Sequence, residues 1–409
     1  QKRGALHLAS PAPVDVIPFR RGPLAGPARL PMPTPASHLG PPPAKGHLSV
    51  ARLSRYWYVA CESKELARRP LARTVLGIPL VLFRGPGGKP AALLDRCPHR
   101  NAPLSLGRMN GVGKLECAYH GWQFDADGCC AHVPGLLGDA AHRDRRVEAF
   151  ATREQQGLVW VFAEPDVEPV GEPFSLELDA PGYATVVRKV EARATLHATL
   201  ENALDVPHTA FLHRGLFRGV ERHSIEAVVR RTANSVEVEY RGEPRPEGVV
   251  GRILSPSGGV VEHFDRFFLP SVAQVEYRLG SENHFVVTAL ATPVEDFHTV
   301  LYAVARFKTR FPPRIVRRVL EPFALRIFRQ DARILERQAR NIQRFGGEQF
   351  ISTEIDLMGA QIWRLLRKAA RAEGAGEDPE SPEPGRSGAG DEDEGRAPDG
   401  KERVVHFEA

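Results

Sequence analysis

The chain has 409 residues, of which 42% are hydrophobic and 26% charged, the composition of an ordinary globular protein with room for two or three domains. No apolar run is long enough to span a bilayer, so we expect no integral membrane segment. Five cysteines, an odd number that includes the adjacent Cys129 and Cys130, are not typical of a disulfide framework. They indicate a reducing, cytoplasmic location in which some thiolates hold a metal.

The net charge of +5 is unevenly distributed. Residues 373–409 are strongly acidic and rich in proline and glycine, which leaves the rest of the chain markedly basic. A basic body can bind nucleic acid or an acidic protein. Because the sequence has no aromatic–basic RNA motif and no recognition helix, we expect no nucleic acid.

Both ends of the chain are predicted to be disordered. Residues 1–48 are rich in proline, glycine and alanine, and cannot bury enough apolar surface to offset the entropy lost on ordering. This arm carries arginine and few acids, as an organelle transit peptide does, but serine is scarce and no amphipathic period is visible. A plain tail is the simplest interpretation, and packing on a neighbouring subunit is a further one. The acidic residues 373–409 form the second disordered tail.

The first folded domain is predicted at residues 49–165. Its short apolar or alternating runs stand between glycine and proline turns, the pattern of an all-β domain. The proline-punctuated residues 166–182 are the predicted linker.

Residues 183–372 are predicted to form a second, α+β domain. Up to residue 309 they read as an antiparallel meander interrupted by a helical stretch around 198–218. From residue 313 the period becomes helical, and Pro322 is expected to begin or kink a helix. The fold class is therefore α+β, with an all-β domain followed by an antiparallel sheet and C-terminal helices.

Two motifs of the first domain each combine a cysteine with a histidine: Cys97-Pro-His99 and Cys117-Ala-Tyr-His120. Two turns that each provide one thiolate and one imidazole suit a [2Fe-2S] cluster with both thiolates on one iron and both imidazoles on the other. Zinc is the alternative, but zinc sites favour CxxC with HxxxH, so the mixed motifs favour the cluster.

The segment Glu201–His213, ENALDVPHTAFLH, brings Asn202, Asp205, His208 and His213 together in the sequence. On a distorted helix both histidines can face one point, and a further carboxylate would complete a two-histidine, one-carboxylate site for a divalent transition metal. Taken alone, the pattern also fits a solvated helix face. Helix capping is the ordinary role for Asn202 and Asp205.

The stretches CPHRNAPLSLG and CAYHGWQFD resemble the Rieske motif. Followed by N-x-x-D-x-x-H-x-x-x-x-H, they resemble the catalytic α subunit of Rieske non-haem iron oxygenases over about residues 49–360. The resemblance implies a helix-grip-type catalytic domain in which His208, His213 and a carboxylate of a late helix hold Fe(II). The QD-x-x-I-L-E-x-Q stretch points to Asp331 as that carboxylate, with Glu336 as the alternative. Asp205 would bridge the two metal centres.

For Asn202, the resemblance implies a position near the iron. The implied activity is O₂-dependent hydroxylation or oxidative demethylation of an organic, aromatic or cyclic small molecule. The CPHR form resembles the monooxygenase and oxidative-demethylase branch, which includes the chlorophyllide a and pheophorbide a oxygenases. A cis-dihydroxylating ring dioxygenase is the alternative, and a non-enzymatic Rieske electron-transfer protein is a third interpretation.

Electrons are expected to come from a separate protein. The chain has no G-x-G-x-x-G motif after a strand, so NAD(P)H would act only indirectly, through a ferredoxin or reductase. The resemblance also implies a homotrimer in which the cluster of one subunit serves the iron of the next. The basic region 306–344 is either a solvated helix face or the dock for an acidic ferredoxin-type donor.

Overall fold

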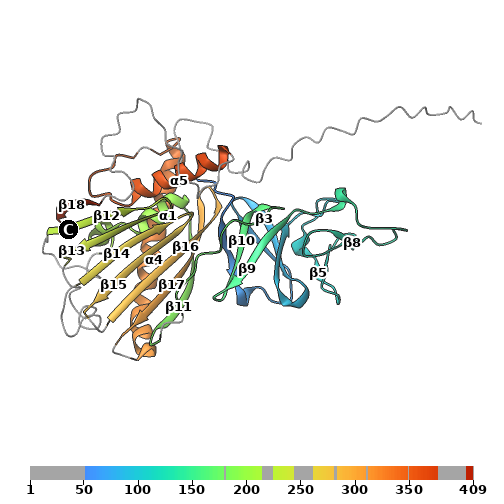
Figure 1. The fold of residues 1–409 in the computed structure, drawn as a ribbon, viewed down its shortest axis with the longest axis horizontal. Coiled ribbons are helices and arrows are strands. Elements are labelled where there is room, and N and C mark those ends of the chain that lie inside the picture. Colours follow the sequence, from blue (N-terminus) through green and yellow to red (C-terminus); the bar gives the residue numbers. More distant parts are fainter. Residues whose placement is uncertain are drawn as a thin grey trace, which may run out of the picture. The chain divides into compact units, whose positions relative to one another are not determined.

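The structure, a computed structural model, describes residues 51–408 except 179–180, 214–223, 244–260, 281–282, 310–311, 349 and 376–401. The predicted arm 1–48 and most of the predicted acidic tail therefore lie outside the described residues. Within the described part, a β-rich N-terminal domain is followed by a large antiparallel sheet with helices (Figure 1). This is the α+β fold that the sequence predicts.

The N-terminal domain contains a six-stranded and a four-stranded antiparallel sheet. The larger sheet has the order β1-β10-β9-β4-β3-β2 and the smaller one β5-β6-β7-β8. The strands are β1 (Trp57–Glu62), β2 (Leu71–Val75), β3 (Ile78–Arg84), β4 (Pro90–Leu94), β5 (Arg108–Met109), β6 (Leu115–Glu116), β7 (Gln123–Phe124), β8 (Cys130–His132), β9 (Ala149–Gln155) and β10 (Leu158–Pro165). Short 3₁₀ turns lie at Ser63–Glu65, Pro86–Gly88, Leu104–Leu106 and Arg143–Arg145.

The larger sheet of this domain buries both of its faces. In β3, Leu80 and Leu82 belong to one hydrophobic cluster, whereas Val81 and Phe83 belong to another. Successive side chains of a strand point to opposite faces, so an uninterrupted apolar run is what such a strand requires. The second cluster also contains Cys97 and Cys117, and the core therefore anchors the two cysteine–histidine loops.

The second domain is built on an eight-stranded antiparallel sheet of order β11-β17-β16-β15-β14-β13-β12-β18. Its strands are β11 (Ala184–Ala192), β12 (Ser224–Arg231), β13 (Ser235–Arg241), β14 (Val261–Phe268), β15 (Val272–Leu279), β16 (Asn283–Glu295), β17 (His298–Lys308) and β18 (Arg403–Glu408). From β12 to β17 each strand pairs with the next along the chain, which confirms the predicted meander.

Among the described residues, four helices accompany this sheet: α1 (Leu196–Ala203), α2 (Val206–Leu212), α4 (Pro313–Arg344) and α5 (Gly359–Ala375). The predicted helical stretch around 198–218 is in fact two short helices with a break at Leu204 and Asp205, and its end lies outside the described residues. The hydroxyl of Thr195 caps α1 by accepting a hydrogen bond from the Ala198 N–H. Helices α1 and α5 share one buried apolar cluster with the sheet, and this burial is the main force that holds them there.

Helix α4 begins at Pro313, where the helical period of the sequence begins. Pro322 was expected to begin or kink a helix, but it lies inside α4, whose first residue is Pro313. A proline at the first helical position lacks only an N–H that would have no partner in any case, so the helix start favours Pro313. The start predicted at Pro322 is wrong because the helix continues through that residue. Within the described residues no helix is long and apolar enough to cross a membrane.

The C-terminal tail is not disordered throughout, which corrects the prediction for residues 373–409. Helix α5 continues to Ala375, and β18 pairs antiparallel with β12 on the side opposite β13. The apolar and β-branched run Val404–Phe407 suits a strand, and the free edge of β12 offers it unpaired backbone N–H and C=O groups. Composition alone hid this strand because the acidic residues dominate the segment.

Candidate metal centres

The two histidines of the central segment lie at opposite ends of helix α2. Asp205 occupies the position before its first residue, His208 lies in its first turn, and His213 follows its last residue. The backbone N–H of His213 donates to the Thr209 carbonyl, at 3.2 Å, so this residue still follows the last turn of the helix. The break between α1 and α2 turns both histidine side chains toward α4.

Asp331 of α4 meets these two histidines. Its Oδ1 lies 3.0 Å from Nε2 of His213 and 3.6 Å from Nε2 of His208, and the two Nε2 atoms are 3.3 Å apart. Within the described residues, His208, His213 and Asp331 are the one group of three or more potential metal-ligand side chains whose ligand atoms all lie within 4.8 Å of one another. Two imidazole nitrogens and one carboxylate oxygen are the donor set typical of non-haem Fe(II) sites with open positions.

The local environment fits a bound cation. Oδ1 of Asp331 is buried and has no hydrogen-bond partner within the described residues, and His213 is 2% exposed. Burial lowers the pKa of His208, but the adjacent carboxylates of Asp205 and Asp331 outweigh it and raise this pKa to about 9. The cluster thus stabilises positive charge at its centre, and a divalent metal ion can take the place of the proton.

Further contacts orient both imidazoles. Nδ1 of His213 lies 2.9 Å from Oε1 of Gln330. Because an amide oxygen only accepts, Nδ1 carries the proton and the Nε2 lone pair points toward Asp331. Nδ1 of His208 contacts the backbone carbonyl of Asp205 and lies 3.5 Å from its carboxylate Oδ2, which leaves Nε2 of this ring free in the same way. Sequence reasoning missed Gln330, and its one available signal was its position directly before Asp331.

Glu336, the alternative carboxylate, has a different environment. Its side chain is 41% exposed and forms an ion pair of 2.5 Å with Arg340, one helical turn further along α4. It lies five positions after Asp331, which rotates it to another side of the helix. The structure brings Asp331, and not Glu336, to the two histidines.

A cavity of about 650 Å³ lies beside the cluster. Asn202, Asp205 and His208 line it together with residues of α4. Three phenylalanines on its border are unusually exposed for aromatic side chains: Phe211 at 81%, Phe345 at 67% and Phe350 at 49%. An exposed aromatic rim of this kind is typical of a surface that another protein covers.

Glu201 also lines this cavity, and sequence reasoning assigned it no role. It lies four residues before Asp205, and both carboxylates line the cavity. Burial, together with the negative charges of Asp205, Asp356 and Glu348, raises the pKa of Glu201 to about 7.

The two cysteine–histidine loops of the first domain have matching backbone geometry. The N–H of Cys97 donates to the Ala102 carbonyl at 2.9 Å, and the N–H of Cys117 donates to the Trp122 carbonyl at 2.8 Å. Each cysteine carbonyl in turn accepts from a residue four positions later, Asn101 or Gly121. Both loops are thus closed by the same pair of backbone hydrogen bonds, as two halves of one site require.

The side chains of these loops converge. Cys97 and Cys117 are 2% and 3% exposed, and the rings of His99 and His120 have centroids 4.5 Å apart. Nδ1 of His99 is buried without a hydrogen-bond partner in the described part of the chain. Burial raises the pKa of the Cys97 thiol, so a thiolate there needs a nearby cation, which iron supplies. These residues fit a [2Fe-2S] cluster.

Aromatic side chains pack around the histidines of these loops. The ring of Trp122 stacks on that of His99 with centroids 4.8 Å apart. The ring centroids of Tyr119 and His120 are 3.8 Å apart. This agrees with a packing role for both aromatic residues. Tyr119 is nonetheless 65% exposed, so the histidine edge of the loops carries an apolar surface.

Comparisons with known proteins match both domains. Residues 56–140 match the family model of the Rieske [2Fe-2S] domain, and residues 192–372 match that of the vanillate O-demethylase oxygenase C-terminal domain. The chain is 39% identical over 164 residues to the oxygenase component of dicamba O-demethylase from Stenotrophomonas maltophilia. That alignment spans 39% of this chain and 47% of the relative, about half its length.

A second relative aligns along most of its length. The vanillate O-demethylase oxygenase subunit of a Pseudomonas species is 26% identical over 348 residues, 78% of this chain and 94% of the relative. The crystal structure of dicamba monooxygenase bound to dicamba has the same fold, with a TM-score of 0.67 and 24% identity over 80% of this chain and all of that one. The chain therefore belongs to the Rieske non-haem iron oxygenases, a family of oxidoreductases, and combines a Rieske domain with the oxygenase domain of that family's catalytic subunits.

Proposed function

We propose that this protein is an oxygenase component that uses O₂ to hydroxylate or oxidatively demethylate an aromatic or cyclic organic molecule. The observation that carries the proposal is the meeting of His208, His213 and Asp331 within 4.8 Å in a chain that also contains the two cysteine–histidine loops. The names of the two relatives, both O-demethylases, favour demethylation over dihydroxylation of a ring.

Each residue of the two sites has a chemical role in this proposal. His208, His213 and Asp331 hold Fe(II) on one face, and Cys97, Cys117, His99 and His120 hold the [2Fe-2S] cluster. Iron at the first site supplies the activation of O₂. Gln330 keeps the Nε2 lone pair of His213 available to the metal by accepting a hydrogen bond from the Nδ1–H of that ring.

The cavity beside the metal site is proposed to receive the Rieske domain of a second subunit. Its rim of exposed phenylalanines suits an apolar partner, and the loop with His120 carries the exposed Tyr119 and, nearby, Leu106, which is 71% exposed. Asp205 lies in this cavity and 3.5 Å from His208, so its carboxylate can join an imidazole of the second subunit to one that holds iron. Asn202, which also lines this cavity, would assist the contact between Asp205 and the two imidazoles. A homotrimer allows every subunit to make this contact in turn.

Replacing Asp331 by alanine tests the metal assignment. The unmodified protein should contain about three irons per chain, two in the cluster and one at the histidines. Asp331→Ala should retain the visible absorption of the cluster, contain about two irons and lose product formation. Glu336→Ala, its control on the same helix, should retain all three irons and full activity.

The reaction type is tested with ¹⁸O₂, a surrogate ferredoxin and reductase, and a panel of methoxylated aromatic compounds. A hydroxylated product should contain one labelled oxygen atom, and a demethylated product should appear with formaldehyde. Two labelled atoms would replace the proposal with ring dihydroxylation. About two irons in the unmodified protein, with no product from any compound, would instead indicate an electron carrier.

A further inference from the structure

The outward side of helix α4 carries a row of arginines with one gap, at Pro322 between Arg318 and Arg326. Eight exposed arginines of α4 lie along one side of it: Arg314, Arg318, Arg326, Arg329, Arg333, Arg337, Arg340 and Arg344. At 100° per residue these positions fall within about 140° of the helix circumference, and they extend over about 45 Å of its length. We call this surface the arginine row.

The orientation of the arginine row is set by the residues on the other side of the helix. Asp331 contacts the two histidines, and the buried Leu335 and Ile342 pack inward. Asp331 lies roughly opposite the middle of the row around the helix axis. The helix cannot rotate the arginines inward without removing its carboxylate from the metal site, so the row must face outward wherever the site is formed.

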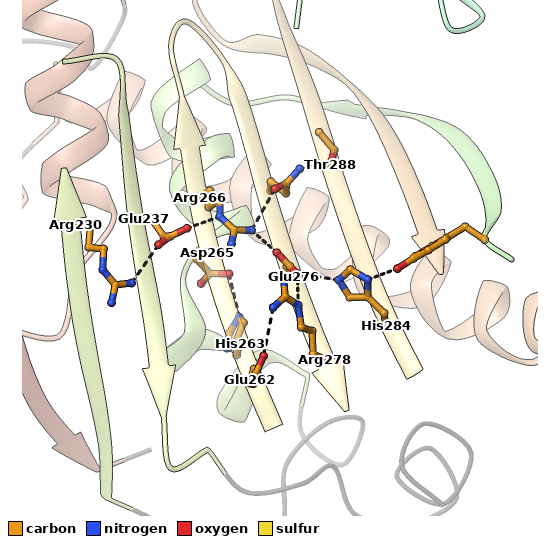
Figure 2. Close-up of polar contacts among 12 residues, drawn as sticks. Arg230, Glu237, Glu262, His263, Asp265, Arg266, Glu276, Arg278, His284 and Thr288 are labelled. Carbon is orange, nitrogen blue, oxygen red and sulfur yellow. Dashed lines mark hydrogen bonds and ion pairs between the residues drawn. The ribbon is translucent and has the colours of Figure 1, made fainter. Parts of the chain in front are cut away.

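Most of the positive charge in the row is not neutralised by the protein itself. Within the described residues, the one ion pair that a member of the row makes is Arg340 with Glu336, at 2.5 Å. The sheet provides a contrast (Figure 2). There Arg266 contacts both Glu237 and Glu276 at 2.5 Å, and Arg278 lies 2.7 Å from Glu276. These sheet arginines are paired with carboxylates, whereas the members of the row other than Arg340 remain available to an anionic partner.

We propose, resting on the function proposed above, that the arginine row is the docking surface for an acidic electron-transfer protein that reduces the Rieske cluster. Clustered positive charge attracts a negatively charged partner and accelerates its association. The first Rieske loop carries the same sign, since Arg100 beside His99 is exposed. An acidic donor is therefore attracted to both surfaces.

This position serves electron transfer in the assembled protein. Ile334, Leu335 and Ile342 of α4 form one wall of the cavity that we propose receives the Rieske domain of the next subunit. A donor on the outer side of the same helix thus lies beside that domain. In each encounter one electron passes from the reduced [2Fe-2S] centre of the donor to the oxidised Rieske cluster, and no atom is transferred.

Charge reversal in the row tests the proposal. The variant Arg318→Glu/Arg326→Glu/Arg344→Glu changes three members of the row and leaves the residues flanking Asp331 intact. The matched control is Arg68→Glu/Arg69→Glu/Arg371→Glu, three exposed arginines outside the row with the same change in net charge. The probe is a reduced, acidic plant-type [2Fe-2S] ferredoxin, mixed in a stopped-flow instrument with the full-length, cluster-loaded protein across a series of salt concentrations.

At low salt, the second-order rate constant for cluster reduction should fall at least about tenfold in the row variant and by less than about twofold in the control. Its dependence on ionic strength should become weaker as well. Dithionite, which needs no docking surface, should reduce all three proteins equally. A rate constant of the row variant within twofold of that of the control would overturn the proposal. An equal fall of the rate constant in both variants would do so as well.

Other occupants of the row give different results. A changed oligomeric state in the row variant, measured by light scattering, together with an unaltered reduction rate would show an interface between copies and overturn the proposal. Binding of duplex DNA that the row variant loses, with unaltered ferredoxin kinetics, would do the same. If the triple variant fails to fold by circular dichroism, Arg318→Gln/Arg326→Gln provides the comparison. Because cluster reduction does not require the mononuclear iron, its outcome is independent of whether Asp331→Ala retains activity.

Discussion

Gln330 and His213 are joined by a contact of 2.9 Å between Oε1 and the ring Nδ1, while the neighbouring Asp331 lies 3.0 Å from Nε2 of the same ring. Two consecutive residues of α4 therefore hold the two edges of one imidazole. The amide fixes which nitrogen carries the proton, and the carboxylate meets the nitrogen that is left with a lone pair.

Removal of this amide should weaken metal binding. In Gln330→Ala the Nδ1 proton loses its acceptor and the ring its orientation, so the affinity of the mononuclear site for Fe(II) should fall about 10- to 100-fold. Gln330→Glu keeps an acceptor and should retain most of the affinity. Titration of metal-depleted protein with Co(II) measures the effect, with Gln343→Ala, exposed on the same helix, as the control. Equal affinities for Gln330→Ala and the control would show that Gln330 does not orient the ligand.

Asp205→Asn should separate electron delivery from metal binding. The carboxylate lies 3.5 Å from His208 Nδ1 but is not one of the three clustered ligand groups, so both metal centres should remain loaded. Loss of its charge should slow reoxidation of the reduced cluster by the iron site at least about tenfold. Single-turnover absorption spectroscopy of pre-reduced protein gives this rate, and metal analysis gives the iron content. An empty iron site in Asp205→Asn would instead make Asp205 a residue that positions His208 alone.

Gly107 should be intolerant of a side chain. A Cβ there would lie 2.1 Å from the carbonyl oxygen of Glu116, the residue before Cys117, and backbone cannot move aside as a flexible side chain does. Gly107→Ala should cost about 1–3 kcal/mol of unfolding free energy and lower the cluster content, because the loop of Cys117 must shift. At Gly111, four residues later, an added Cβ would meet no atom within 4 Å, so Gly111→Ala should be neutral. Thermal unfolding and the visible absorption of the cluster measure both effects.

The protonation of Glu201 should make stability depend on pH. Its pKa is raised to about 7 in the folded protein from the ordinary value of 4.5, so the folded state binds the proton more tightly than the unfolded state. The contribution of this carboxyl to the free energy of unfolding is therefore fully present below pH about 4.5 and is lost as the pH rises through 7. The side chain is 34% exposed, and solvent screening reduces the effect to about 1 kcal/mol. Glu201→Gln should remove this loss. The free energy of unfolding of the variant, measured by denaturant titration, should therefore rise relative to that of the unmodified protein between pH 5 and 8. An advantage independent of pH would show that the carboxyl does not titrate in this range.

Elements with a strong local pattern were predictable from the sequence. The meander from β12 to β17 follows from alternating side chains, and the turn between Arg231 and Ser235 has the polar residues of a hairpin. The cysteine–histidine loops are short, each closed by hydrogen bonds within a few residues, so their spacing alone indicated one site. The arginine row likewise follows from the helical period of α4, once its length is known.

Long-range relationships required the tertiary structure. Whether Asp331 or Glu336 faces the histidines depends on the rotation of α4 about its axis, which is set by packing of Leu335 and Ile342 against distant elements. The same rotation places Gln330 beside His213, a contact between residues 117 positions apart. The pairing of β18 with β12 also joins distant segments, and no local period records it.

The sequence by itself determined which chemical groups are available: two thiols and two imidazoles in one pair of loops, and two imidazoles with nearby carboxylates in the other site. Only the tertiary structure decided which carboxylate joins the second group, which amide orients it, and which side of α4 is left to face a partner. The physical reason is that side-chain periodicity and turn formation are local, whereas the rotation of a helix is settled by the burial of apolar surface contributed by the whole domain.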